Sequence, residues 1–561
     1  MGCIILMQWH QNAHAGQSQP RPAEELQRQQ QRERELRKGF EPQEDVRLPR
    51  EAASIDSLRI PEGETPCFLI QQIRLVGEES ARFQFALRDL VEGEGAVIGR
   101  CLGIQGINAA IARAQNAIIA KGFVTTRVLA APQDLSAGEL VLTVIPGRIR
   151  DIRFSPDSSP HSNIWNALPA KSGDLLNLRD IEQALENFKR PPTADADIQI
   201  EPAAEPGAKP GESDLVIRYR QSFPFRLTIS ADDSGSETTG RTLGAVTLSG
   251  DNLLALNDLF YFSVNRNLDD RNNDDRGTRG YTAHYSLPFG YWMLALTAGR
   301  NRYKQSVAGF SQDYVYEGES SNATLELSRI LYRDASRKTT ASLQTYLETS
   351  RNYIDDTEIE VQRRRMAGWK AALAHREFIG PATLDLDLSY QRGTGMMNAL
   401  PAPEEPFDEG TARPKIINAE AQLNLPFTLA GLSMRYLGDW RAQWNRTPLV
   451  PQDRFLIGGR FTVRGFDGET ILSAERGWLI RNDLSLMLGE TGQQIYLGID
   501  YGEVGGQTAE LLLGRRLGGA VAGLRGGYKG FYWDIFAGGA LKAPDGFPTG
   551  GVTGFNLSFT Y

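Results

Sequence analysis

The feature that most constrains the fold is a two-residue alternation of apolar and polar side chains, which runs from about residue 221 to the C-terminus. The segment Leu384-Asp-Leu-Asp-Leu-Ser-Tyr-Gln391 shows it most clearly, because its leucines fall on one side of a strand and its aspartates on the other. The last segment alternates in the same way through Phe555, Leu557, Phe559 and Tyr561. An apolar edge at the chain end would aggregate unless it were closed within lipid.

We therefore predict a transmembrane β-barrel over residues 222–561 whose interior is polar and accessible to water. Its 340 residues suffice for about 16 antiparallel strands at roughly 20 residues per strand and connection. Two small α/β domains and an N-terminal helix are expected to precede it. The expected domain limits are 1–15 for a truncated signal peptide, 16–40 for the helix region, 41–66 for a linker, and 67–147 and 148–221 for the α/β domains.

Composition excludes several classes of protein. Hydrophobic residues make up 41%, and no stretch approaches the roughly 18 to 20 consecutive apolar residues of a membrane-spanning helix. A net charge of -8 argues against a nucleic-acid partner, which needs a basic face. The five histidines form no metal-ligand spacing, and no nucleophile-elbow motif occurs. We expect no enzyme activity, no metal site and no cofactor.

The N-terminal region carries two features that bear on export. Ala13-His-Ala15 has the small-x-small form of a signal-peptide cleavage site, and a meaningless unstructured N-terminus is the alternative. Residues 23–39 are strong helix formers that are polar on every face. Such a helix is either solvated or housed in a polar cavity. The proline-containing stretch up to residue 66 is expected to be an extended tether.

Residues 67–147 and 148–221 repeat one order of strand, helix and strands. If Cys3 leaves with the signal peptide, Cys67 and Cys101 remain as an even pair suited to one disulfide in an oxidising compartment. The helix of the second unit carries Leu185 and Phe188. We consider these two residues as candidates for a substrate groove, although their apolar stripe favours a simple role in the core.

A glycine-rich segment with one arginine is the candidate functional motif of the barrel. Gly465 allows a tight turn, and the planar guanidinium of Arg464 can hold a carboxylate through two hydrogen bonds. Asp500 alternates with Leu497 and Ile499, so it faces the lumen if those apolar residues face lipid. The alternative is that Arg464 is only the solvated arginine of a hairpin.

Four motifs resemble one known family. They are Pro66-Cys-Phe-Leu-Ile-Gln-Gln-Ile-Arg-Leu75, Cys101-Leu-Gly-Ile-Gln-Gly-Ile-Asn108, Gly122-Phe-Val-Thr-Thr-Arg-Val128 and Val463-Arg-Gly-Phe466. In this order they resemble the two-partner secretion transporters, the hemolysin secretion/activation proteins of the Gram-negative outer membrane. The resemblance implies a 16-stranded barrel, a plug helix, a linker and two periplasmic POTRA domains, which together export one large unfolded exoprotein without ATP.

The resemblance also implies residue roles. Val463, Arg464, Gly465 and Phe466 would form the tip of the sixth extracellular loop, folded into the lumen, and Asp500 would be the partner of Arg464 on the barrel wall. The implied partners are a secreted exoprotein with an N-terminal secretion domain from an adjacent gene, outer-membrane lipid and lipopolysaccharide, and the barrel-assembly machinery during biogenesis. The cargo could be a hemolysin, an adhesin or a contact-dependent toxin.

Two other functions are compatible with a barrel. An assembly factor that inserts other barrels into the outer membrane shares the barrel and the loop motif by resemblance, but those proteins usually carry more POTRA domains. A passive porin would have no reason to carry periplasmic α/β domains or an occluding helix. Two α/β copies and a polar helix therefore favour export.

Overall fold

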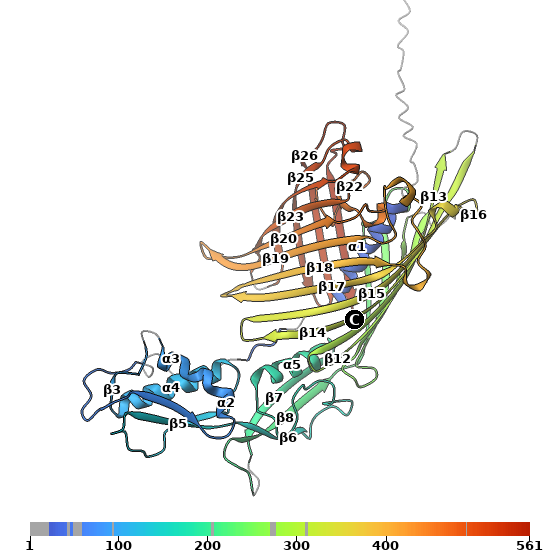
Figure 1. Cartoon of the computed structure of the whole chain (residues 1–561). Coiled ribbons are helices and arrows are strands. Elements are labelled where there is room, and N and C mark those ends of the chain that lie inside the picture. The colour runs from blue at the N-terminus through green and yellow to red at the C-terminus, as the bar shows by residue number, and fades with distance from the viewer. Residues whose placement is uncertain are drawn as a thin grey trace, which may run out of the picture.

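The computed structural model describes residues 22–41, 45–48, 59–92, 95–203, 207–269, 276–308, 312–489 and 491–561. The expected signal peptide at 1–15 and half of the linker lie outside these residues. Figure 1 shows a barrel with α1 (Pro22–Phe40) inside it and two α/β units at one end. Within the part of the chain described, no helix is long and apolar enough to cross a bilayer.

The barrel closes through sixteen long strands, with each strand antiparallel to its neighbours in the chain and the last paired with the first. These strands are β9 (Phe225–Asp232), β10 (Leu243–Asp251), β11 (Leu259–Asn267), β12 (Gly277–Phe289), β13 (Trp292–Ala308), β14 (Asp313–Arg333), β15 (Arg337–Ile354), β17 (Arg364–Ile379), β18 (Ala382–Thr394), β19 (Lys415–Leu429), β20 (Leu432–Asn445), β23 (Arg476–Met487), β24 (Gln494–Gly505), β25 (Arg516–Tyr528), β26 (Phe531–Lys542) and β27 (Val552–Thr560). The two-residue strand β16 (Thr357–Glu358) extends the connection between β15 and β17. This confirms the predicted fold class.

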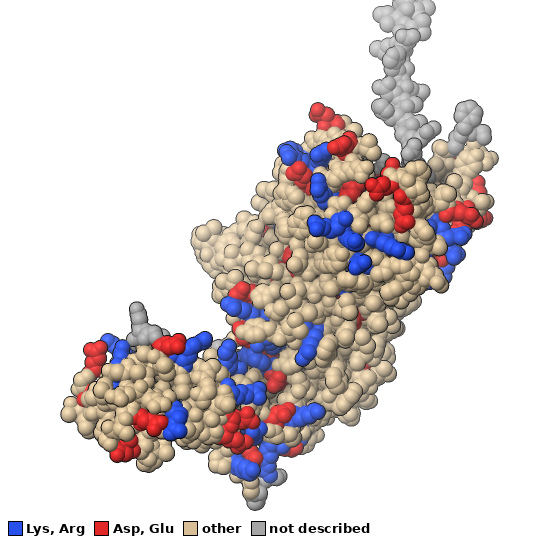
Figure 2. All heavy atoms as spheres, viewed as in Figure 1, with Lys and Arg blue, Asp and Glu red and all other residues tan. Residues whose placement is uncertain are grey.

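The barrel has an apolar outer face and a polar inner face, as the alternation predicted. In β24, Leu497 and Ile499 are exposed on the outside, whereas Asp500 is 1% exposed and faces the lumen. Figure 2 shows the corresponding surface, where much of the barrel wall is free of charged side chains and charges gather at the ends and over the α/β units. Closure between β27 and β9 rests on five residue pairs, from Asn556↔Asp232 to Thr560↔Thr228.

Helix α1 follows ordinary rules for helix ends, although it has no apolar face. Pro22 stands at its first position, where a missing backbone N–H costs nothing. Glu24 and Glu25 lie in the first turn, and Arg37 and Lys38 in the last, which complements the helix dipole. The helix lies in the lumen, where polar wall residues can satisfy its side chains. This is the polar cavity that its composition required.

The first α/β unit packs α4 (Ile104–Ala120) against a sheet of three strands in the order β2-β5-β4. Its other elements are β1 (Phe68–Leu69), β2 (Gln72–Val76), α2 (Ser80–Phe83), η2 (Gln84–Leu87), α3 (Arg88–Val91), β3 (Cys101–Leu102), β4 (Arg127–Leu129) and β5 (Glu139–Ile145). A disulfide joins Cys67 to Cys101 beside the paired strands β1 and β3. It ties the entry of the unit to the start of its long helix.

The second α/β unit is simpler than the first. It has β6 (Arg148–Phe154), α5 (Leu178–Lys189), β7 (Ala194–Pro202) and β8 (Glu212–Gln221), with its sheet in the order β6-β8-β7. Within the described chain, residues 155–177 contain neither helix nor strand. In the second unit this loop connects β6 to α5. In the first unit the corresponding connection, between β2 and α4, contains the short helices α2, η2 and α3. The loop of the second unit lies against the barrel, as described below.

Candidate functional site

The plug helix α1 is held in the lumen by polar contacts near its N-terminal end. The amide Nε2 of Gln27 lies 3.0 Å from the carbonyl oxygen of Pro451 and 2.9 Å from that of Arg454. Arg28 donates to the carbonyl oxygen of Gly468 at 3.0 Å. These acceptors belong to one long connection between β20 and β23, so plug and loop hold each other in place.

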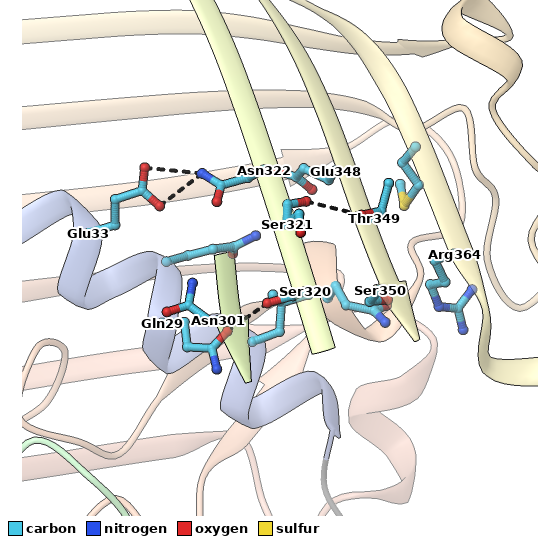
Figure 3. Close-up of a pocket in the computed structure, with 14 residues that line it drawn as sticks. Gln29, Glu33, Asn301, Ser320, Ser321, Asn322, Glu348, Thr349, Ser350 and Arg364 are labelled. Carbon is cyan, nitrogen blue, oxygen red and sulfur yellow. Dashed lines mark hydrogen bonds between the residues drawn. The ribbon is translucent and has the colours of Figure 1, made fainter. Parts of the chain in front are cut away.

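Further along the helix, the plug contacts the barrel wall directly. Ser320 donates to the side-chain oxygen of Gln29 at 2.9 Å, and Asn322 donates to the carboxylate of Glu33 at 2.9 Å. Figure 3 shows these pairs bridging the gap between the helix and strand β14. Past the plug's C-terminal end, a cavity of about 770 Å³ lies between α1, α5 and several strands. The lumen is therefore obstructed but not filled.

The β20–β23 connection folds into the barrel and carries the predicted motif. Its short strands β21 (Phe455–Ile457) and β22 (Leu472–Ala474) pair with each other and frame the segment between them. Arg464 lies inside this frame and is 4% exposed. Its Nε is 2.7 Å and its Nη2 is 2.8 Å from the two carboxylate oxygens of Asp500, and its backbone N–H also donates to Asp500 at 3.0 Å. The structure thus brings Arg464 and Asp500 together on the lumen side of β24.

A second carboxylate joins this pair. Asp483 on β23 accepts a hydrogen bond from Nη2 of Arg464 at 2.5 Å, and its other oxygen accepts one from Arg525 at 3.1 Å. The sequence reasoning missed Asp483. The signal was present, because Asp483 and Ser485 alternate with Leu484 and Leu486 and so fall on the lumen face.

The other motif residues fix the position of the arginine. Val463 and Phe466 are 0% and 5% exposed and belong to an apolar cluster inside the barrel. Gly465 has a φ of 97°, which favours glycine, and a Cβ there would lie 2.4 Å from the carbonyl oxygen of Gly539. A Cβ on Gly519 would lie 1.7 Å from the carbonyl oxygen of Arg464. The loop therefore rests directly on barrel backbone, which only glycine permits.

At the end of the barrel that meets the α/β units, the helix α5 is clamped between the linker and the barrel. Glu186 and Glu182 accept hydrogen bonds from the backbone N–H groups of Val46 and Leu48, at 3.1 and 3.0 Å. Arg333, at the end of β14, binds both carboxylates, at 2.8 Å for Glu186 and 3.3 Å for Glu182. One arginine thus connects the barrel, the second α/β unit and the linker that leads back to the plug.

The linker contributes a charge of its own to this clamp. The carboxylate of Asp45 lies 2.8 Å from Nζ of Lys338 and also contacts Arg376. Burial alone would raise the pKa of Asp45, but the two cations outweigh it and hold that pKa below its usual value. The carboxylate is therefore ionised at neutral pH and bridges the linker to the barrel.

The structure places the two residues that were considered for a substrate groove in a hydrophobic core. Leu185 and Phe188 are 3% and 0% exposed and pack in the core of the second α/β unit with Tyr219 and Ile217. This burial is what the alternative, a simple role in the core, predicts. The other face of α5 is buried too, because its acidic residues meet the linker and Arg333. This helix serves to pack and to dock.

Together, a closed lipid-facing barrel, an internal polar helix, an inward-folded loop and two preceding α/β units define an outer-membrane transporter with POTRA domains. Comparisons with known proteins agree. Residues 211–526 match the family model "Haemolysin secretion/activation protein ShlB/FhaC/HecB", residues 68–147 match the model "POTRA domain, ShlB-type", and residues 148–202 match another POTRA model. The chain belongs to the haemolysin secretion/activation family of two-partner secretion transporters. It resides in the outer membrane, with POTRA 1 (68–147) and POTRA 2 (the second unit) in the periplasm.

Several relatives span most of the chain. The "Outer membrane transporter CdiB-2" of Burkholderia pseudomallei is 36% identical over 88% of this chain and 86% of the relative. The "Hemolysin transporter protein ShlB" of Serratia marcescens is 26% identical over 72% of this chain and 71% of the relative. The solved structure of CdiB from Acinetobacter baumannii superposes with a TM-score of 0.83 at 30% identity and covers 97% of this chain and 100% of that one.

Proposed function

We propose that this protein exports one large unfolded exoprotein from the periplasm to the cell surface through the barrel lumen, and that α1 leaves the lumen during export. The observation that carries the proposal is the nature of the obstruction. Helix α1 is bound to loop and wall through hydrogen bonds and through the ion pair of Arg34 with Glu420 on β19, without an apolar face that would anchor it permanently. Such a plug can be displaced.

The exoprotein would carry an N-terminal secretion domain and be encoded by an adjacent gene. An unfolded chain presents free backbone donors and acceptors, and a POTRA edge strand such as β7, which among the described strands pairs only with β8, could bind it by β-augmentation. Folding of the exoprotein outside the cell would then draw export forward, because folding removes the species that can slide back. No nucleotide is needed for this step.

The loop motif would hold the β20–β23 connection in one position inside the barrel. We propose that Arg464, held by Asp500 and Asp483, keeps the β20–β23 connection against the wall, so that this connection can receive the plug and release it. The barrel at 222–561 would conduct the cargo, with 16–40 as plug and 41–66 as tether. Lipopolysaccharide and phospholipid would surround the barrel, and the barrel-assembly machinery would insert it.

The test is secretion of the neighbouring gene's product by cells that carry wild type, Arg464→Ala or Arg516→Ala. Arg516 is the matched control, because its side chain is 53% exposed and its ion pair with Glu503 lies at the surface. We expect Arg464→Ala to abolish secretion and Arg516→Ala to preserve it. The amount of folded barrel in the outer membrane, read from its heat-modifiable gel mobility, separates lost function from lost assembly.

Other outcomes would point to the rival functions. A general loss of outer-membrane barrels in the Arg464→Ala strain would favour an assembly factor. A change in small-solute uptake alone, with the exoprotein still secreted, would favour a porin. Arg464→Lys adds a further check, because lysine keeps the charge but cannot bind both carboxylate oxygens as a planar fork. We expect it to restore little secretion.

A further inference from the structure

The POTRA 2 loop between β6 and α5 holds a large apolar side chain in the open. Trp165 is 69% exposed, although the loop around it is firmly bound. The adjacent Asn166 is fully buried and donates from its side chain to the carbonyl oxygens of Leu256 and of Pro288, the latter at 3.0 Å. An exposed tryptophan on a rigid support is a feature that packing within the chain does not explain.

The support of this loop is the periplasmic end of the barrel. Asn257, in the turn between β10 and β11, donates to the side-chain oxygen of Asn166 at 2.8 Å. The backbone N–H of Gly290, in the turn between β12 and β13, donates to the carbonyl oxygen of Asn166 at 2.8 Å. POTRA 2 is therefore fixed to two barrel turns beside β12, in the place where Figure 1 shows this unit meeting the barrel.

The ring of Trp165 continues the lipid-facing surface of the barrel. It packs edge-on against Phe289 with 5.0 Å between ring centroids, and Phe289 is exposed on the outer side of β12. Phe289 pairs with Trp292 at the start of β13, and the guanidinium of Arg329 lies 4.9 Å above the ring of Trp292. Aromatic rings with a neighbouring arginine mark the headgroup level of a bilayer.

The neighbouring strand ends carry more exposed apolar side chains at the same end of the barrel. They are Phe223, Phe225, Leu253 and Leu254. Phe225 begins β9, and the two leucines lie in the turn between β10 and β11. Trp165 thus adds a side chain of POTRA 2 to the patch that these barrel residues form, which we call the periplasmic apolar rim.

We propose that Trp165 is a membrane-interface anchor, through which POTRA 2 sits in the headgroup region of the phospholipid leaflet that faces the periplasm. The partner is phospholipid because the rim is continuous with the lipid-facing wall and outside the lumen that a cargo would follow. The amphipathic indole is the side chain best suited to this boundary. The anchor would limit the tilt of POTRA 2 relative to the membrane while the plug and the cargo pass the periplasmic end of the barrel.

The test uses the full chain reconstituted in bilayers of phosphatidylethanolamine and phosphatidylcholine, with and without phospholipids brominated near the headgroup. Trp165 is one of eight tryptophans, so its emission is obtained as the difference between wild type and Trp165→Phe. Phenylalanine keeps a ring against Phe289, so the fold is retained. Trp478→Phe is the matched control, because Trp478 is 37% exposed on the outer side of β23.

We expect Trp165→Phe to remove about as much bromolipid-quenchable emission as Trp478→Phe does. If Trp165→Phe instead removes only emission that acrylamide quenches from the water phase, the anchor is overturned and Trp165 is left free for a polypeptide in the periplasm. The readout needs no exoprotein. It therefore stands or fails independently of the secretion experiment on Arg464.

Discussion

Replacing Gln27 by alanine should weaken the binding of the plug in the lumen, by an amount that follows from the hydrogen bonds of this side chain. The amide of Gln27 lies within 3.3 Å of three carbonyl oxygens, those of Pro451, Gln452 and Arg454, but its two hydrogens serve two acceptors at a time. Two neutral hydrogen bonds contribute about 1–3 kcal/mol net. The ratio of plugged to unplugged barrel should therefore fall by roughly 5- to 150-fold.

Ion conductance of the purified protein in planar bilayers measures this ratio as the fraction of time that a barrel is open. Gln30→Ala is the matched control, because Gln30 lies on the same helix, is exposed, and undergoes the same change in helix propensity. We expect a clear rise in open time for Gln27→Ala only. Equal open fractions in the two variants would refute the view that polar contacts to the β20–β23 connection set the stability of the plug.

Three further predictions concern the periplasmic parts. Arg333→Met should expose the linker and α5 to limited proteolysis, because Glu182 and Glu186 lose the cation that they share and keep only their separate contacts with Arg179 and Lys338; unchanged protection would contradict the clamp. Cys67→Ser should lower the unfolding free energy of POTRA 1 by about 2–4 kcal/mol, seen as an earlier urea transition for that domain and not for the barrel. Asp45 has a lowered pKa in the folded protein, so its ionised carboxylate stabilises the clamp fully at pH values above the ordinary carboxyl pKa of about 4. This stabilisation is lost as the pH falls through the lower folded-state pKa. Proteolysis of the linker should therefore increase in acid for wild type, whereas Asp45→Asn should be sensitive already at neutral pH.

Much of the barrel could be predicted from sequence because one face of each strand meets lipid and the other meets water. That contrast produces the alternation seen in β24, and the same alternation placed Asp500 on the inner face, where the structure has it. The identity of the second carboxylate, Asp483, depended on the register between the neighbouring strands β23 and β24 and on where the inward-folded loop places Arg464 against them. The alternation within one strand shows which face a residue lies on, but it gives neither the register nor the path of the loop.

The role of α5 was beyond sequence reasoning for a different reason. Its acidic residues Glu182 and Glu186 are 0% and 8% exposed, yet their spacing is typical of a solvated helix face. A polar face that packs against another polar surface has the same composition as one that meets water. The partner, Arg333, lies some 150 residues further along the chain. Trp165 was missed likewise, because a lone tryptophan in a loop has no periodic context.

The polar lining around α1 has a consequence for the passage of a chain. Wall residues such as Ser320 and Asn322 donate hydrogen bonds to side chains of the plug, and water could replace each of these hydrogen bonds if the helix left the lumen. A polar, hydrated wall of this kind offers no apolar surface to which an unfolded polypeptide would bind during its passage. The property that lets α1 rest in the lumen without an apolar anchor would also make the emptied lumen a conduit of low friction.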